Sequence, residues 1–254
     1  MKYIYLSKKT VYILIGCFIT SIFLLSFISL RTISTSSTPV SMQDTVNGLF
    51  DSPQKNAFLT FDDGPTIKQT NKILDILKEE NVRASFFVIG RNVKEHPEIV
   101  KRAYTEGHYI ANHGYSHKNY KLYQSTESFF NEIQDTDKEI AKALELDEYC
   151  SHFFRFPNGF MSPSYKGEKK KMLNVLKDMN YVYVDWNCLN KDSETKCSDY
   201  QLMQNLKNSI NTDGTLIILM HDTGDVNITS NVLKDSILFL KDQGYTFKNF
   251  YDIL

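Results

Sequence analysis

Several classes of protein are excluded by what the chain lacks. Only 11 glycines and 6 prolines occur among its 254 residues, so the sequence is neither collagen-like nor of low complexity. Its 29 basic and 30 acidic side chains nearly cancel, and no overall positive charge indicates a nucleic-acid-binding protein. The P-loop, G-x-G-x-x-G and H-E-x-x-H patterns are also absent, which removes three common signatures as guides to function.

Cysteine is scarce, with four residues and no C-x-x-C spacing. We therefore expect neither a thiolate zinc site nor a thioredoxin-like redox centre. Cys17 lies within a long apolar run, which leaves Cys150, Cys188 and Cys197 outside it. A Cys188–Cys197 disulfide would close a short loop in an exported protein, but an odd number of cysteines leaves one thiol free or paired between chains.

The N-terminal region contains the one long apolar run, residues 11–30, which carry no charge. A helix of twenty residues is about 30 Å long, enough to span the hydrocarbon core of a bilayer. Three lysines precede the run and one arginine follows it, so we expect residues 1–10 to form a basic cytoplasmic tail. We predict a single-pass, uncleaved signal-anchor. Cleavage as a signal peptide is the alternative and would release the protein, although no small-x-small site follows the run.

Residues 31–55 are rich in serine and threonine and show little apolar periodicity, which predicts a linker outside the membrane. Four of the basic side chains and none of the acidic ones lie before residue 32, so the remainder has a net charge of −5. We therefore expect a mildly acidic body at residues 56–250, held at the outer face of the cell membrane by the basic anchor.

Short apolar runs alternate with amphipathic stretches throughout this body, which predicts an α/β fold with a parallel sheet and outer helices. Seven strands could form an open doubly wound sheet or a closed barrel, and periodicity does not choose between them. The expected strands are 57–61, 85–89, 108–112, 152–156, 181–184, 216–220 and 245–247. The expected helices are 67–80, 96–106, 126–146, 169–179, 199–210 and 231–243.

Polar side chains follow five of the expected strands. In parallel α/β folds, catalytic groups gather at the carboxyl ends of the strands. These positions therefore indicate a metal-assisted acid–base site. The residues are Asp62, Asp63, His113, His117, Arg155, Asp185, Asp192, His221 and Asp222.

Two of these pairs have a spacing that suits a metal. Asp62 and Asp63 are adjacent, and neighbouring carboxylates repel unless a cation or a shared proton separates their roles. His113 and His117 lie four residues apart, so both rings can reach one ion together with a carboxylate. Each pair also has an ordinary explanation, since Asp-Gly-Pro is common turn chemistry and histidine pairs occur for hydrogen bonding alone.

Two single residues have comparable alternatives. Arg155 lies between two phenylalanines at the end of a strand, where it either pairs with a buried carboxylate or is simply exposed. His221 follows the apolar run TLIILM and either titrates at the mouth of the sheet or pairs with the adjacent Asp222.

Taken in order, the motifs TFDDGP, H-x-x-x-H, R-x-P-x-G and L-x-H resemble those of the polysaccharide deacetylases. These are the NodB-homology domains of carbohydrate esterase family 4. The resemblance runs from about residue 56 to 247, nearly the whole exported body. It implies a distorted (β/α) barrel of about seven parallel strands.

The resemblance also implies catalytic and metal-binding roles. Asp62 matches the catalytic base, Arg155 the arginine that orients it, and His221 the general acid. A divalent metal is implied, most often zinc, with cobalt or another ion as an alternative. The positions that match its ligands are Asp63, His113 and His117.

Three further positions match substrate contacts. The peptide N–H of Asn158 matches an oxyanion donor, Leu219 matches the lining of the acetyl pocket, and Trp186 belongs to the fourth motif. Asn158 stands where the family often has an aromatic residue or glycine, and the fourth motif is only partly present. The register from Trp186 favours Asp192 as the acid that tunes His221, with Asp185 as the competing candidate.

These inferences predict a membrane-anchored, metal-dependent N-deacetylase of a cell-wall glycan, with N-acetylglucosamine in peptidoglycan as the expected target. We expect the glycan and the membrane as its partners, and neither nucleic acid nor an obligate protein partner. The alternatives are an O-acetyl esterase of xylan type that uses the same site and a catalytically inactive glycan-binding relative.

Overall fold

The computed structural model describes residues 41–194, 196–223 and 229–254. The predicted basic tail at residues 1–10 and the predicted signal-anchor at residues 11–30 lie outside this part of the chain. Within the described ranges, none of the helices combines the length and the apolar character needed to cross a bilayer.

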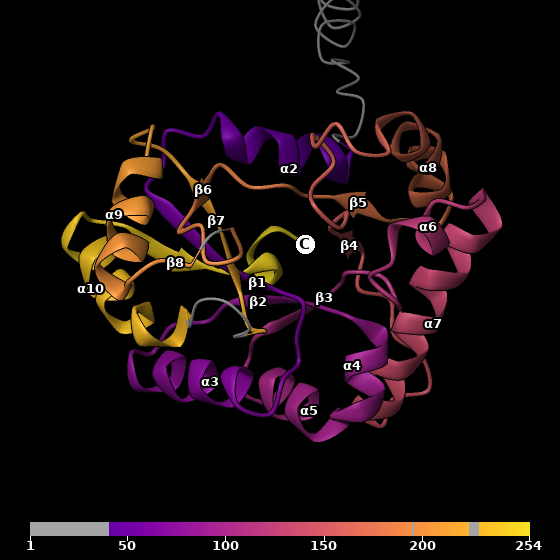
Figure 1. Cartoon of the computed structure of the whole chain (residues 1–254), viewed down its shortest axis with the longest axis horizontal. Helices are drawn as coiled ribbons and strands as arrows, with labels where there is room; N and C mark the ends of the chain where they lie inside the picture. Colours follow the sequence, from indigo (N-terminus) through magenta and orange to yellow (C-terminus); the bar gives the residue numbers. More distant parts are fainter. Residues whose placement is uncertain (1–40, 195, 224–228) are drawn as a thin grey trace, which may run out of the picture. The chain divides into compact units, whose positions relative to one another are not determined.

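The described strands form one parallel sheet around a long central strand, β1 (Figure 1). β1 pairs with β7 along its length and with β8 and β2 at its beginning and end. The sheet order is β5-β4-β3-β2-β1-β7-β6, with β8 added beside β1. The strands are β1 (Asn56–Asp62), β2 (Ser85–Val88), β3 (Tyr109–Asn112), β4 (Phe153–Phe154), β5 (Val182–Tyr183), β6 (Cys188–Leu189), β7 (Leu216–His221) and β8 (Thr246–Lys248).

This arrangement confirms the predicted α/β class with parallel strands but modifies the predicted barrel. Every strand expected from the sequence is present, and β6 is an additional strand of two residues. β5 and β6 are the two ends of the sheet and do not pair with each other within the described chain. The sheet is therefore a half-barrel rather than a closed barrel.

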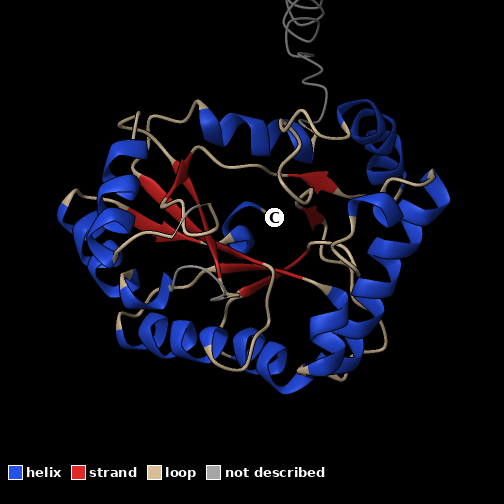
Figure 2. Ribbon diagram, viewed as in Figure 1, coloured by secondary structure: helices blue, strands red, loops and turns tan. Residues whose placement is uncertain are grey.

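Helices surround the strands, as Figure 2 shows. Their apolar faces are directed at the sheet; in α3, for example, Ile73, Leu74 and Leu77 are fully buried. The helices are α2 (Met42–Phe50), α3 (Gln69–Glu79), α4 (Gly90–Glu95), α5 (Pro97–Thr105), α6 (Asn119–Leu122), α7 (Thr126–Leu144), α8 (Lys166–Asp178), α9 (Asp199–Ser209) and α10 (Leu233–Asp242), with short 3-10 turns η1 (Thr229–Asn231) and η2 (Phe250–Ile253).

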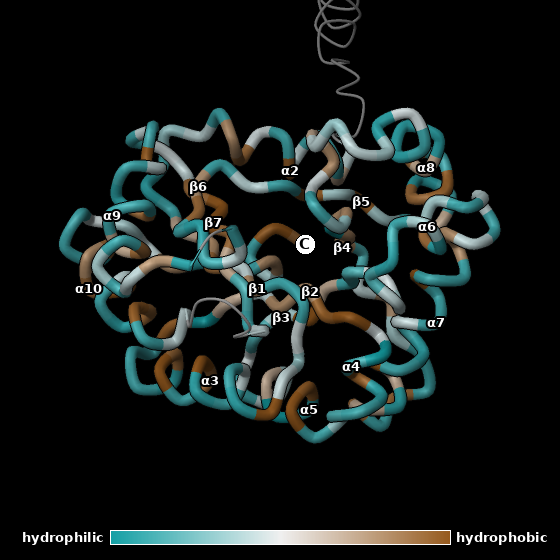
Figure 3. Tube along the Cα trace, in the orientation of Figure 1, coloured by the Kyte–Doolittle hydropathy of each residue, from teal (hydrophilic) through white to brown (hydrophobic). Residues whose placement is uncertain are grey.

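Burial of apolar side chains on both faces of the sheet supplies the main stabilising term. The strands are hydrophobic along most of their trace, and the helices are hydrophilic on their outer turns (Figure 3). On the inner face, Phe250 of η2 packs against four aromatic rings contributed by four different strands, with the Phe153 ring centroid 4.6 Å away. The C-terminal turn thus fills the space inside the half-barrel.

Helix α2 corrects the predicted extent of the linker at residues 31–55. Val46 of α2 is 1% exposed and belongs to the inner core. The Gln43 amide accepts from the peptide N–H of Tyr183 and donates to its carbonyl, both at 3.1 Å. Because Tyr183 lies on the edge strand β5, this side chain satisfies backbone groups that a neighbouring strand would otherwise bind. The low apolar periodicity of residues 42–50 concealed a helix with few buried side chains.

The disulfide left open between Cys188 and Cys197 is not formed. Cys188 is instead a buried thiol on β6, with its sulfur 3.0 Å from Ser209 Oγ. Burial raises the pKa of the Cys188 thiol to about 11, so the thiolate that disulfide exchange requires is scarce at neutral pH.

Candidate active site

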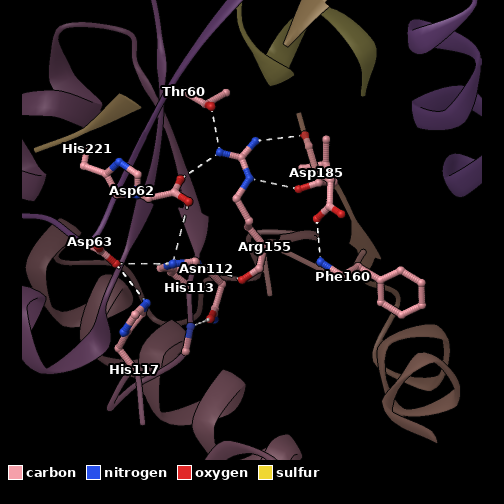
Figure 4. Close-up of polar contacts among 12 residues, drawn as sticks. Thr60, Asp62, Asp63, Asn112, His113, His117, Arg155, Phe160, Asp185 and His221 are labelled. Atoms are coloured by element: carbon pink, nitrogen blue, oxygen red, sulfur yellow. Dashed lines mark hydrogen bonds and ion pairs between the residues drawn. The ribbon is translucent and has the colours of Figure 1, made fainter. Parts of the chain in front are cut away.

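The carboxyl ends of the parallel strands bring the predicted polar residues together. Asp62 ends β1 and His221 ends β7, and these two residues are partners in the register of the paired strands. His113 follows β3, and Arg155 follows β4. Figure 4 shows their side chains converging on one region, with Asp63 and His117 beside them.

Asp63, His113 and His117 form a compact cluster that fits a divalent metal. Asp63 Oδ1 lies 3.4 Å from His113 Nε2 and 3.1 Å from His117 Nε2, and the three ligand atoms lie within 4.8 Å of one another. Tetrahedral zinc with bonds of about 2.1 Å separates its ligand atoms by about 3.4 Å. Asp63 Oδ1 is buried and accepts no hydrogen bond in the described part of the chain, as expected of an atom that serves as a ligand.

The surroundings of this cluster act on the protonation of its ligands. Burial lowers the pKa of His113, but the neighbouring Asp62 and Asp63 outweigh it and raise that pKa. His113 Nδ1 lies 2.8 Å from the carbonyl oxygen of Arg155, a bond that places the proton on Nδ1 and leaves the Nε2 lone pair available. Burial alone would raise the pKa of Asp63, but the neighbouring His113 and His117 outweigh it and hold that pKa well below its usual range. Burial lowers the pKa of His117, which favours the neutral imidazole that a metal requires.

Asp62 is held by a different partner from Asp63. Arg155 Nη1 donates to Asp62 Oδ1 at 2.8 Å and to Thr60 Oγ1 at 2.7 Å. The Arg155 side chain is fully buried, and its guanidinium lies 4.1 Å from the centroid of the Phe87 ring. These two hydrogen bonds from one buried guanidinium fix the orientation of the Asp62 carboxylate. Asp62 is therefore held at the edge of the metal cluster, with its Oδ2 3.8 Å from His113 Nε2.

His221 pairs with Asp192 and not with Asp185 or Asp222. Asp192 Oδ1 lies 2.7 Å from His221 Nδ1, while Asp192 Oδ2 accepts the peptide N–H of His221 at 2.7 Å. Burial would lower the pKa of His221, but the bond to Asp192 and the nearby Asp62 and Asp63 raise it to about 9. His221 is therefore protonated at neutral pH and can donate a proton.

The carboxyl group of Asp222 contacts the segment after β1 and makes no hydrogen bond to His221. Its Oδ2 accepts a hydrogen bond from Thr70 Oγ1 at 2.7 Å, and burial raises its pKa to about 7. A Cβ atom at Gly64 would lie only 2.0 Å from Asp222 Oδ2. The glycine of the Asp-Asp-Gly sequence is thus required by close packing against Asp222.

The three residues expected to contact substrate lie on nearby segments. Leu219 is 5% exposed and lies on β7, two residues before His221. Asn158 is exposed on the loop after Arg155, with φ of 62°. The Trp186 ring centroid lies 5.7 Å from the Arg155 guanidinium.

Glu132 is a residue of the site that the sequence reasoning missed. Its carboxylate accepts the peptide N–H groups of Tyr115 and Ser116 at 2.8 and 2.7 Å, together with the Ser116 hydroxyl at 2.7 Å. It therefore supports the loop between the two histidines of the metal cluster. One signal was available, because Glu132 is a charged residue beside the apolar face of α7 that buries Phe129 and Ile133.

Comparison with known proteins gives the same family as the motifs. A model of the polysaccharide deacetylase family matches residues 51–184. A peptidoglycan-N-acetylglucosamine deacetylase of Bacillus cereus is 32% identical over 219 residues, which cover 84% of this chain and 76% of the relative. The peptidoglycan-N-acetylmuramic acid deacetylase PdaA of Bacillus subtilis is 30% identical over 201 residues, which cover 79% of this chain and 72% of the relative.

A solved structure agrees with these sequence matches. The structure of a Streptococcus mutans CE4 esterase is similar with a TM-score of 0.72 and 30% identity, covering 82% of this chain and 90% of that one. The two relatives described above are named as deacetylases, hydrolases of non-peptide carbon–nitrogen bonds, which is the enzyme class predicted from the motifs. The chain belongs to the polysaccharide deacetylase family.

Proposed function

We propose that the chain hydrolyses N-acetyl groups of N-acetylglucosamine in peptidoglycan, using a divalent metal, and that this metal is zinc. The observation that carries the proposal is the convergence of three functions at one sheet edge. These are an arginine-held carboxylate (Asp62), a compact ligand set around Asp63, and a histidine whose partner keeps it protonated (His221). Together they suit attack of water on an amide.

The residues divide the proton transfers between them. Asp62, held in place by Arg155, accepts a proton from the attacking water. His221, protonated through Asp192, donates a proton to the departing amine of the sugar. Acetate and a free amino group are the products, and no side chain forms a covalent bond to the substrate. When bound, a divalent ion supplies Lewis-acid polarisation and lowers the pKa of water.

The substrate proposal is supported by the relatives and by the N-terminal sequence. One relative is named for N-acetylglucosamine and another for N-acetylmuramic acid, both in peptidoglycan. The uncharged run at residues 11–30 supports anchoring in the cell membrane with the catalytic unit on the wall side. A cell-wall glycan next to the membrane is therefore within reach of the enzyme.

Acetate release by the full chain in mild detergent tests this proposal. The substrates are purified peptidoglycan, N-acetylglucosamine oligomers and an O-acetylated xylan, each with zinc and after chelation. We expect metal-dependent acetate and an equal amount of free amine from the first two substrates. Acetate from the xylan alone would identify an O-acetyl esterase.

The remaining outcomes are also distinguishable. Mass spectrometry of digested peptidoglycan locates the free amine, and its occurrence only on muramic acid would overturn the assigned sugar. Absence of acetate from all substrates, despite one bound metal per chain, would indicate a glycan-binding relative without activity. The Asp62→Asn variant serves as the inactive control, because its amide cannot accept the proton.

A further inference from the structure

Asp185 has a role of its own, since it does not contact His221. Both oxygens of its carboxylate accept backbone hydrogen bonds: Oδ1 from Phe160 N–H at 2.9 Å and Oδ2 from Met161 N–H at 3.1 Å. Its carbonyl oxygen also accepts a bond from Arg155 Nη2 at 3.2 Å. Figure 4 shows Asp185 between Arg155 and Phe160. One residue thus connects the arginine that holds Asp62 with the loop that follows it.

A buried lysine of helix α8 also binds this loop. Lys169 of α8 is 1% exposed, and its Nζ donates to the carbonyl oxygen of Gly159 at 2.6 Å. The ammonium also lies 6.0 Å from the centroid of the Tyr123 ring. A lysine is rarely this buried without a specific partner, because desolvation of the charge is costly. The cation therefore binds a loop carbonyl while the Asp185 anion binds the next two amides.

The loop needs such support because its conformation is unfavourable by itself. Asn158 and Gly159 have consecutive positive φ angles of 62° and 77°, a region that costs energy for a residue with a side chain. A Cβ atom at Gly159 would lie 2.8 Å from the Trp186 ring. Within the described chain, the peptide N–H of Asn158 has no acceptor, so it is available to a ligand.

We propose that Asp185 and Lys169 are positioning residues that hold residues 158–161 so that the Asn158 N–H is directed at the oxygen that becomes negative during amide hydrolysis. This inference rests on the proposed function. Neither side chain touches the reacting atoms. Their effect is preorganisation, which matters because a hydrogen-bond donor stabilises a developing charge only when it is fixed before the reaction.

The Asp185→Asn variant tests the anionic half of this arrangement. The amide oxygen of the asparagine can accept one of the two peptide N–H groups. Its NH₂ group is a donor and cannot accept the other. We expect kcat on N-acetylglucosamine oligomers to fall about 10–100-fold, as for a displaced catalytic group, with KM within about twofold and zinc content unchanged. Asp178→Asn, an exposed acid at the end of α8, is the matched control. A fall in zinc content or an unchanged kcat would overturn the proposal.

The Lys169→Met variant tests the contact of the lysine with the loop. It also keeps the proposal testable if Asp185→Asn fails to fold. Methionine keeps most of the length and the apolar packing of the side chain but cannot donate to Gly159. We expect a similar loss of kcat with little change in KM, whereas Lys170→Met, at the exposed neighbouring position, should be unaffected. Equal kinetics of the two lysine variants would contradict a positioning role for Lys169.

Hydrogen exchange of the loop amides separates this inference from the proposed function, because it needs no activity. The Phe160 and Met161 amides should be protected in the unmodified chain and exchange at least about tenfold faster in Asp185→Asn. Equal exchange in both proteins would overturn the inference. The unmodified chain could release no acetate while its loop amides still exchange more slowly than those of Asp185→Asn. That result would overturn the proposed function but would still establish that Asp185 supports the loop.

Discussion

Asp192 holds His221 at two points, the ring and the backbone. One carboxylate oxygen lies 2.7 Å from His221 Nδ1, and the other accepts the peptide N–H of the same residue at 2.7 Å. Thr229 Oγ1 donates to the second oxygen as well. The imidazole is thereby fixed in orientation and in tautomer, and only its Nε2 remains available to the substrate.

Replacement of Asp192 should change the pH range of activity. His221 has a pKa of about 9, and it must be protonated to donate to the leaving amine, so kcat should fall as the pH rises through about 9. In Asp192→Asn the main cause of the raised pKa is lost, and this alkaline limb should move at least one unit lower. The pH profile of kcat measures the shift, with Glu194→Gln as control. If the alkaline limb of the profile does not move, a group other than His221 causes the fall in kcat.

Removal of the partner of Asp62 should destabilise the fold. Arg155→Met leaves a buried carboxylate without its cation, which costs about 3–5 kcal/mol of unfolding free energy in comparable pairs. Urea unfolding at pH 7 measures the loss, and Arg91→Met provides the control at an exposed position. The double variant Asp62→Asn/Arg155→Met should recover part of it. If the double variant is as unstable as the single one, the loss comes from packing against Phe87.

Removal of a metal ligand should abolish tight zinc binding. His117→Ala leaves two of three protein ligands, so zinc content should fall from one per chain to well below one after dialysis. His96→Ala, a histidine outside the cluster, should keep the full content. Elemental analysis gives the stoichiometry, and a rise of Tm on zinc addition should be seen only in proteins that bind the ion. Full zinc content in His117→Ala would refute the ligand assignment.

Glu132 should affect the metal without binding it. The Glu132→Gln amide cannot accept all three hydrogen bonds from Tyr115 and Ser116, so the loop that carries His117 becomes less rigid. Residues that orient metal ligands typically contribute about 10–100-fold in affinity, and zinc titration against a competing chelator should show a loss of this size. Asp135→Asn, at a half-buried acid on the same helix, should bind zinc normally. Equal affinities of the two variants would exclude this supporting role.

Helix α2 should contribute to stability, although its sequence is typical of a linker. Val46 is 1% exposed in the inner core, and an aspartate there would bury an unpaired charge. Val46→Asp should therefore lower Tm strongly, while Thr45→Asp, at an exposed position of the same helix, should change it little. Equal Tm values would mean that residues 42–50 are dispensable for the fold.

The sequence predicted those strands and helices whose hydrophobic pattern follows directly from the burial of one face. Alternation of apolar runs and amphipathic stretches predicted every long strand and the helices α3, α5, α7, α8, α9 and α10, because burial of one face sets the period. It missed α2, whose nine residues include one buried side chain. Three short elements were also missed: β6 has two residues, α6 has four and α4 has six, too few for a period to be detected. Such elements are held by the neighbours they contact.

The residues of the site also divide into those that local motifs predict and those that only tertiary contacts reveal. From its order of motifs, the sequence by itself determined the family and the strand ends where the polar residues lie. Only the tertiary structure decided which acid contacts His221, because Asp185 and Asp192 both follow β5 in the sequence. In the folded chain Asp192 contacts His221, whereas Asp185 contacts the loop at Phe160 and Met161. Glu132 is recognisable only in the folded chain, since its hydrogen bonds reach across 16 and 17 residues. Contacts between distant segments depend on how the helices pack on the sheet, and no local pattern records that packing.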